Sequence, residues 1–234
     1  MSALGGCAIT VGVDAMMVGM TETWTQPLIS VDVVPLRYRP ETVEVVLGRR
    51  AFEPFAGELA LPGVLMQRER SSDAADRALG SKVGVDAAQV VIRDVGIEDA
   101  PERDPRGPTL SIVKVAAVAP GATPESGEGV PLAEAVGLPF DHDALVRLAA
   151  RRLLELLWAD REVTEAFFGE AFTSRDAFLA QEQLAAAAGV ERTPPLRNLR
   201  RRIEELGWAA PTGETRESTA RGGRPTLVWA WTRD

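Results

Sequence analysis

The sequence has almost none of the residues that build disulfide frameworks or zinc sites. Its 234 residues include a single cysteine, Cys7, and a single histidine, His142. An internal disulfide needs two cysteines, and a typical zinc site needs a cluster of cysteines and histidines. We therefore expect an intracellular, cytoplasmic protein without disulfides and without zinc.

Signals that direct a chain to a membrane are also missing. Residues 1–22 are largely apolar, but Asp14 interrupts them and they lack the positively charged start of a secretory signal. We interpret them as an N-terminal extension. The mean hydropathy of −0.04, with 45% hydrophobic and 26% charged residues, is typical of a globular chain with no membrane partner. A length of 234 residues favours two domains.

The sequence has no overall excess of positive charge, since the formal net charge is −8. That balance argues against a nucleic-acid partner, because binding to phosphates needs a basic surface. The charge is unevenly distributed, however. Residues 192–224 contain eight arginines and four acidic residues, a local balance of +4 that leaves −12 for the rest of the chain. A phosphate-binding surface is therefore expected in this C-terminal segment.

The first half of the chain has the pattern of an α+β domain. Short runs of β-branched residues predict strands over residues 28–36, 43–47, 90–97 and 110–118. Residues 71–83 predict a helix that Ser71 or Ser72 caps. The segments 103–108 and 120–131 are rich in proline or glycine and predict loops.

Helices dominate the second half. The predicted helices cover residues 141–160, 174–188 and 193–206. Thr173 or Ser174 caps the second helix, and Gly189 ends it. Thr193 caps the third helix with Pro194 at its first position, where the missing amide costs nothing.

The third predicted helix has one apolar and one basic face. Its apolar residues, Leu196, Leu199, Ile203 and Leu206, recur at helical spacing, and the opposite face is rich in arginine. A capped helix, a turn and a basic helix follow the order of a helix-turn-helix, whose second helix enters the major groove of DNA. The sequence therefore favours DNA binding by this helix.

A hairpin follows the basic helix. Residues 208–212 and 226–231 predict strands, and the loop between them contains arginines beside glycines, as in a wing that contacts the DNA backbone or minor groove. The candidate DNA-binding residues are Thr193, Arg197, Asn198, Arg200, Arg201, Arg202, Arg221 and Arg224. The alternatives are an arginine face that binds only water, or RNA or protein binding by the same module.

A motif in the first half resembles the Nudix box. The spacing from glycine to glutamate to arginine fits, and the matching residues are Gly63, Glu69, Arg77, Leu79, Gly84 and Val85. The glutamates that hold magnesium in Nudix hydrolases are replaced by Ala78, Ser81 and Lys82. We therefore expect the fold without a metal site and without metal-dependent hydrolysis, so that the protein is not an enzyme.

The surrounding segments extend this resemblance. Residues 45–50, Pro54, Phe55 and residues 103–107 resemble the ADP-ribose-preferring branch of the Nudix superfamily. Together with the C-terminal helices, residues 25–234 resemble the Nudix-related transcriptional regulators of NAD metabolism. The resemblance implies a sandwich-like Nudix α/β/α ligand-sensing domain over residues 23–138 and a winged helix-turn-helix DNA-binding domain over residues 139–234.

The same resemblance implies a homodimeric repressor of NAD biosynthesis or salvage genes. It would bind a palindromic operator, release it when ADP-ribose binds as effector, and require no cofactor. Two alternatives remain open: a divergent Nudix pyrophosphatase that cleaves ADP-ribose, and a regulator of the same fold that senses a sugar or another nucleotide.

Several residues are candidates for contacting the ligand. Guanidinium groups bind pyrophosphate without a metal, and the candidate ligand-binding residues are Arg49, Arg50, Phe55, Leu61, Gly63, Glu69, Arg77 and Arg106. Phe55 either stacks on a base or packs in the core. Arg77 either contacts the ligand or pairs with Glu69. His142, beside Asp141 at a predicted helix start, is interpreted as a junction or capping residue.

Overall fold

A mixed β-sheet with helices on both faces forms the first half of the computed structural model, which describes residues 26–191, 193, 195–216 and 225–233. The strands are β1 (Leu28–Arg39), β2 (Thr42–Arg49), β3 (Leu59–Ala60), β4 (Gly63–Leu65), β5 (Val90–Glu98), β6 (Thr109–Val118) and β7 (Gly127–Pro131). They run in the order β3-β2-β1-β6-β5, with β4 paired to β1 and β7 paired to β2. The central pair, β1 and β6, is parallel.

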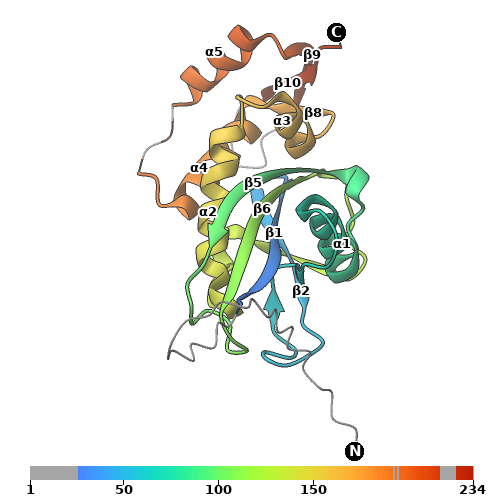
Figure 1. Ribbon diagram of the computed structural model, residues 1–234. Coiled ribbons are helices and arrows are strands. Elements are labelled where there is room, and N and C mark those ends of the chain that lie inside the picture. The colour runs from blue at the N-terminus through green and yellow to red at the C-terminus, as the bar shows by residue number, and fades with distance from the viewer. Residues whose placement is uncertain (1–25, 192, 194, 217–224, 234) are drawn as a thin grey trace, which may run out of the picture.

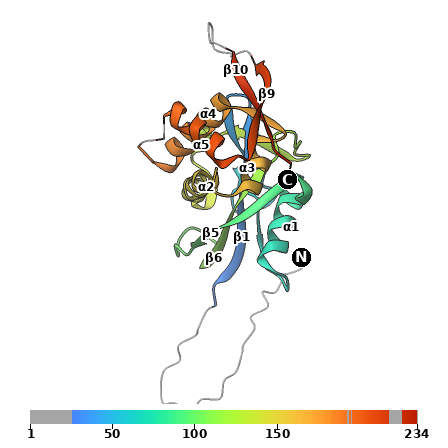
Figure 2. The same ribbon diagram turned by 90° about the horizontal axis from the view of Figure 1, so that it is seen from above.

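Each face of the sheet is covered by a helix. Alternate residues of a strand point to opposite faces, and β1 accordingly sends Val31 and Val33 to one hydrophobic cluster and Val34 and Leu36 to another. Helix α1 (Ser71–Val83) packs into the first cluster and α2 (His142–Leu156) into the second. Figures 1 and 2 show these two helices on opposite sides of the sheet. The sheet and these two helices thus form a three-layered α/β/α sandwich, whose α2 layer lies beyond the predicted sandwich domain of residues 23–138.

The predicted elements of the sandwich are confirmed, with two corrections. Helix α1 spans the predicted residues, but its N-cap is Arg70 rather than Ser71 or Ser72. The helix begins at Ser71 as expected, and the Asp73 carboxylate accepts the Arg70 amide at 3.4 Å, so the cap lies one residue before the predicted serines.

The second correction concerns the segment 120–131, which was predicted as a loop but contains β7. Gly127 pairs with Gly48 of β2, and a Cβ atom at position 127 would come within 2.8 Å of the Val83 side chain. Glycine is therefore required for the close approach of this strand to α1, although in a sequence it reads as a loop residue.

The predicted helix over residues 141–160 is divided in the structure. Helix α2 ends at Leu156, and α3 (Arg161–Phe168) follows. The carboxylate of Asp160 accepts the Val163 amide at 3.2 Å, so that this residue caps a new helix instead of ending the old one. The strand β8 (Ala171–Thr173) and helix α3 are both absent from the sequence prediction.

Helix α4 (Ser174–Ala188) agrees with the prediction. Thr173 caps it by accepting the Asp176 amide at 3.0 Å, and Gly189 ends it in the left-handed conformation. Helix α5 (Leu196–Leu206) begins later than predicted: its N-cap is Pro195, and Thr193 does not cap it. A residue followed by proline is disfavoured in a helix, so the helix begins only after the second of two consecutive prolines.

Two further strands complete a small second sheet. These are β9 (Ala209–Arg216), which runs beyond its predicted end at residue 212, and β10 (Thr226–Trp231), which agrees with the prediction. They join β8 in the order β8-β10-β9. Within the described residues, no helix combines the length and apolarity needed to cross a membrane.

The two halves share one hydrophobic core. The cluster on the α2 side of the sheet continues through α3 and α4 to Leu199 and Ile203 of α5. Tyr38 of β1 donates a hydrogen bond to Asp176 of α4 at 3.0 Å. The predicted division between residues 138 and 139 remains a prediction, and α2 packs against both the sheet and α4.

Candidate functional site

A cavity of about 670 Å³ opens at the end of the sandwich where α2 begins. Strands β1 and β2, helix α1 and the loop between β5 and β6 contribute to its wall, together with Phe140 and His142. Six of the eight candidate ligand residues line it: Arg49, Arg50, Leu61, Gly63, Arg77 and Arg106. The volume is in the range of small-molecule binding sites.

Two arginines converge on one aromatic ring in this pocket. The guanidinium groups of Arg50 and Arg106 lie 4.5 Å and 5.5 Å from the centre of the Phe140 ring. Burial and the neighbouring Arg106 charge lower the pKa of Arg50 from its ordinary value. Two like charges held together at a partly buried site favour an anion between them.

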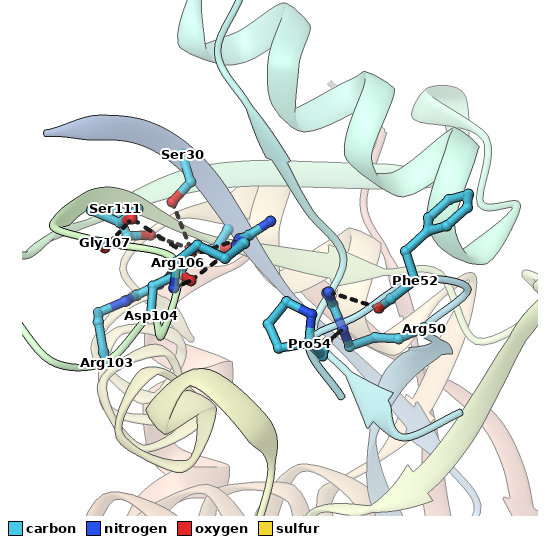
Figure 3. A network of polar contacts seen from close by, with 11 residues as sticks. Ser30, Arg50, Phe52, Pro54, Arg103, Asp104, Arg106, Gly107 and Ser111 are labelled. Atoms are coloured by element: carbon cyan, nitrogen blue, oxygen red, sulfur yellow. Dashed lines mark hydrogen bonds and ion pairs between the residues drawn. The ribbon is translucent and has the colours of Figure 1, made fainter. Parts of the chain in front are cut away.

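Both arginines are oriented by fixed acceptors. Arg50 donates to the carbonyl oxygens of Pro54 at 2.8 Å and Phe52 at 3.2 Å, whereas Arg106 binds the Asp104 carboxylate at 2.9 Å and 2.7 Å. Figure 3 shows the Arg50 contacts on one side of the site and the Arg106–Asp104 contacts on the other. Neither Arg50 Nη1 nor Arg106 Nη1 has a partner among the described residues, so both can donate to a ligand.

The aromatic residues of the pocket differ from the sequence prediction. Phe55 lies outside the pocket wall and packs edge-on against Phe140, with ring centres 4.9 Å apart. Phe52, which no sequence argument identified, lines the pocket and is 77% exposed. The core-packing alternative for Phe55 fits this position, and Phe52 is the ring available for stacking.

The remaining Nudix-box residues support the loop before α1. Glu69 lies outside the pocket wall and forms an ion pair with Arg77, which also donates to the Leu65 carbonyl at 3.0 Å. The pairing alternative for Arg77 therefore fits the structure. One edge of the Arg77 side chain still faces the pocket.

The positions of the missing glutamates offer no set of metal ligands. Ala78 is buried, Ser81 donates to the Arg77 carbonyl at 2.6 Å, and Lys82 lines the pocket as a cation. In the described parts of the chain, no three histidine, cysteine or acidic side chains are grouped so that they could hold a metal ion. These residues therefore do not fit a magnesium cluster, whose protein ligands are mainly carboxylate oxygens.

A buried polar cluster at the inner end of the pocket was missed by sequence reasoning. The Asp32 carboxylate on β1 accepts hydrogen bonds from Ser30, Ser111 and Arg103, the first and the last at 3.0 Å. Its signal in the sequence is an acidic residue within an otherwise apolar strand. Asp32 and Arg103 are 71 positions apart, so only the folded chain brings them together.

His142 also belongs to the pocket wall. It is the first residue of α2, as expected for a junction residue, and its Nδ1 accepts the Leu61 amide at 3.1 Å. Burial lowers the pKa of His142 from 6.5 to about 4, so the ring is neutral at pH 7.

This buried histidine predicts a loss of stability in mild acid. Between pH 7 and 5 the imidazole of His142 becomes protonated in the unfolded chain but stays neutral in the folded chain. The free energy of unfolding should therefore fall by about 2 kcal/mol over this range. Urea unfolding at pH 7 and at pH 5 measures this change in the free energy of unfolding. His142 is the only histidine, so the variant His142→Asn should lose most of this pH dependence, and an equal loss in the variant would contradict the assignment.

Gly63 is predicted to tolerate no side chain. A Cβ atom at this position would lie 2.1 Å from Asp32 Oδ1. Gly63→Ala is therefore expected to displace the carboxylate and lower the free energy of unfolding by about 1 to 3 kcal/mol. The matched control is Gly80→Ala in α1, where an added Cβ meets nothing within 4 Å and stability should not fall. Denaturant unfolding of both variants measures the difference.

The C-terminal candidates on α5 are exposed, and they differ in their partners. Arg197, Asn198, Arg200 and Arg201 are exposed on α5, opposite the buried Leu199 and Ile203. Arg200 and Arg201 face Glu204 and Glu205 at 3.1 Å and 3.6 Å.

The other C-terminal candidates are placed differently. Arg202 donates to the Trp158 carbonyl at 3.1 Å and so ties α5 to the end of α2. Thr193 is half-buried and precedes the helix. Arg221 and Arg224, the expected tip of the wing, lie outside the described residues.

Comparison with known proteins gives matches among solved structures. No protein-family model and no curated protein matches the sequence. The structure is similar to Shewanella oneidensis NrtR complexed with a 27mer DNA, with a TM-score of 0.69, 24% identity, and coverage of 87% of this chain and 93% of that chain. For Shewanella oneidensis NrtR without DNA, the TM-score is 0.65 at 24% identity, covering 88% and 94%.

A second kind of relative has the same arrangement. A MutT/nudix family protein from Enterococcus faecalis is 21% identical, with a TM-score of 0.60 and coverage of 90% of both chains. These likenesses show that the chain shares the mixed α/β, Nudix-like fold of these proteins along almost its whole length.

Proposed function

We propose that this chain is a DNA-binding transcriptional repressor whose sandwich binds ADP-ribose, or a related nucleotide, as an anti-repressor. The observation that carries the proposal is the position of α2. Its first turn and the residues before it line the cationic pocket, and its body packs against α4 in the shared core. Figure 1 shows α2 running from the pocket end of the sandwich toward α4 and α5.

The second half is proposed to be a winged helix. The order α3-β8-α4-α5-β9-β10, with the small sheet in the order β8-β10-β9, supports this assignment. Helix α5 is the proposed recognition helix, because it follows α4 through a turn and exposes a basic face. The similarity of 87% of the chain to NrtR complexed with DNA supports the same assignment.

The pocket is proposed to bind a diphosphate between Arg50 and Arg106. Each guanidinium group keeps free N–H donors, and paired guanidinium groups bind phosphate oxygens without a metal. Phe52, exposed at the mouth of the pocket, provides a ring for a base. A nucleoside diphosphate fits this arrangement, because its base can stack on Phe52 while its two phosphates bind Arg50 and Arg106.

Ligand binding is proposed to act on DNA binding through the start of α2. Phe140 and Asp141 have left-handed backbones, with φ of 60° and 57°, which for residues other than glycine costs about 1 to 3 kcal/mol each. A diphosphate held by Arg50 and Arg106 competes with Phe140 for their charges. A ligand shifts an equilibrium only when it binds one geometry better, and this competition provides such a difference.

The remaining features follow from the sequence resemblance. A homodimer in which two copies of α5 contact a palindromic operator would match the two-fold symmetry of such DNA. NAD biosynthesis or salvage genes are the proposed targets, and the cytoplasm is the proposed location. We also propose that no cofactor is required.

A hydrolysis assay separates this proposal from a divergent pyrophosphatase. Purified protein incubated with ADP-ribose and magnesium is expected to release no AMP, because Ala78, Ser81 and Lys82 provide no metal ligands. A Nudix hydrolase with its box intact serves as the positive control. Magnesium-dependent release of AMP would replace the proposed function with the enzyme.

A selection experiment tests the DNA-binding half. The full chain is mixed with a pool of random duplexes, and the bound fraction is sequenced after several rounds. Enrichment of a palindromic sequence is expected, since two recognition helices of a dimer read two half-sites. Recovery of a pool without any enriched sequence would contradict a sequence-specific repressor.

A further inference from the structure

Only one of the two oxygen atoms of the Asp32 carboxylate, at the inner end of the pocket, accepts hydrogen bonds from the described residues. Asp32 Oδ2 accepts all three hydrogen bonds, from Ser30, Ser111 and Arg103. Oδ1 accepts none from the described residues, and it faces Gly63, where a Cβ atom would lie only 2.1 Å away. The absence of a side chain at position 63 leaves this acceptor accessible from the cavity, which both residues line.

Unused donors lie beside this acceptor. The Arg103 side chain is only 4% exposed, and its Nε and Nη1 atoms are buried without any hydrogen-bond partner among the described residues. Buried guanidinium donors are normally satisfied, and leaving them unpaired is costly. Arg103 also lines the cavity, and Figure 3 shows it beside Ser111 and Asp104, on the side of the site away from Phe52.

His142 adds a neutral donor to the same wall. Its Nδ1 accepts the Leu61 amide, so the neutral ring carries its proton on Nε2. No described residue accepts that proton. The inner end of the pocket therefore combines one free carboxylate oxygen of Asp32 with three nitrogen donors, Nε and Nη1 of Arg103 and Nε2 of His142.

This combination favours uncharged groups that both donate and accept hydrogen bonds. A phosphate or carboxylate would be repelled by Asp32, and an ammonium group would be repelled by Arg103. An apolar group would leave the donors of Arg103 unsatisfied. Hydroxyl groups donate and accept at the same atom, so neighbouring hydroxyls of a sugar satisfy the carboxylate and the donors together.

We propose that Asp32, Arg103 and His142 form a subsite that binds the hydroxyl groups of a sugar attached to the far phosphate of the ligand. This inference rests on the proposed diphosphate site at Arg50 and Arg106, and it orients the ligand within the pocket. The base lies at Phe52, the diphosphate lies over Phe140, and the sugar without a base lies at the inner end. Recognition of that sugar distinguishes ADP-ribose from ADP.

Calorimetric titration of the full wild-type chain with ADP-ribose and with ADP tests the subsite. ADP-ribose is expected to bind at least about tenfold more tightly, because it alone supplies hydroxyls to the buried acceptor and donors. Equal affinities would overturn the subsite while leaving the diphosphate site in place. Failure of both ligands to bind would overturn the proposed function, and with it the subsite.

Two variants separate the subsite from the diphosphate site. Asp32→Asn should reduce the preference for ADP-ribose over ADP to about twofold or less and change ADP affinity little. Arg106→Gln should weaken the binding of both ligands and retain the preference for ADP-ribose over ADP. Arg103→Gln, which removes the guanidinium donors of the subsite, repeats the test if Asp32→Asn does not fold. An undiminished preference in a folded Asp32 or Arg103 variant would overturn the proposal.

Discussion

Replacement of both Arg50 and Arg106 by glutamine is expected to weaken ADP-ribose binding by at least about 100-fold. Each guanidinium group has an Nη1 atom without a partner among the described residues, and would donate a charge-assisted hydrogen bond, typically about 1.5 to 3 kcal/mol, to a phosphate oxygen. Calorimetric titration measures the loss. The double variant should still bind the selected duplex without ligand, because both residues lie in the pocket and α5 contributes nothing to its wall.

Arg49 provides a comparison within the same pocket. Its guanidinium group already donates to the Gly57 carbonyl at 2.7 Å and to Glu128 at 3.2 Å, and its side chain is 61% exposed. Arg49→Gln should therefore reduce ADP-ribose affinity by about threefold at most, since exposed ion pairs contribute little. A loss as large as that of the double variant would place the diphosphate elsewhere.

Replacement of Arg197 and Asn198 by alanine is expected to weaken binding to the selected duplex by at least about 30-fold. Both side chains are exposed in the first turn of α5, the part of a recognition helix that contacts base edges, and each base contact is typically worth about 1 to 3 kcal/mol. Fluorescence anisotropy with the selected duplex and with a scrambled duplex measures the change.

The two duplexes distinguish reading of bases from contact with the backbone. Binding to the scrambled duplex should change much less in the Arg197 and Asn198 variant. Arg201→Ala, in contrast, is expected to weaken binding to both duplexes about equally and to lower the salt dependence of that binding. Arg151→Ala on α2, an equally exposed arginine, is the matched control and should leave both affinities unchanged. An unchanged affinity of the Arg197 and Asn198 variant for the selected duplex would exclude α5 as the recognition helix.

The sequence predicts the elements well where local physics determines them. The strands predicted at residues 28–36 and 43–47 form within β1 and β2, which extend a few residues further, and helices α1 and α4, with their periodic apolar residues, span the predicted residues. The errors also have physical reasons. Gly127 pairs with Gly48 in a strand and is required where that strand approaches α1, a tertiary contact that its own segment does not show, and two consecutive prolines delay the start of α5.

The site is less predictable because tertiary structure assembles it. The Nudix resemblance led to Arg50, Gly63 and Arg106, which do line one pocket. Phe140 was not predicted, since nothing in its own segment shows that two distant arginines lie over its ring. Asp32 was not predicted as a site residue for the same reason, although an acidic residue inside a largely apolar strand is a usable signal of a buried polar site in other sequences.

Coupling between the pocket and DNA is tested directly by an anisotropy titration of ADP-ribose into the complex of the full chain with its selected duplex. Coupling between two sites is typically about five- to 150-fold, and we expect ADP-ribose to weaken DNA binding by about tenfold or more. The Arg50 and Arg106 double variant should bind the duplex and ignore the ligand. An unchanged DNA affinity, at ligand concentrations that calorimetry shows to saturate the pocket, would contradict the account.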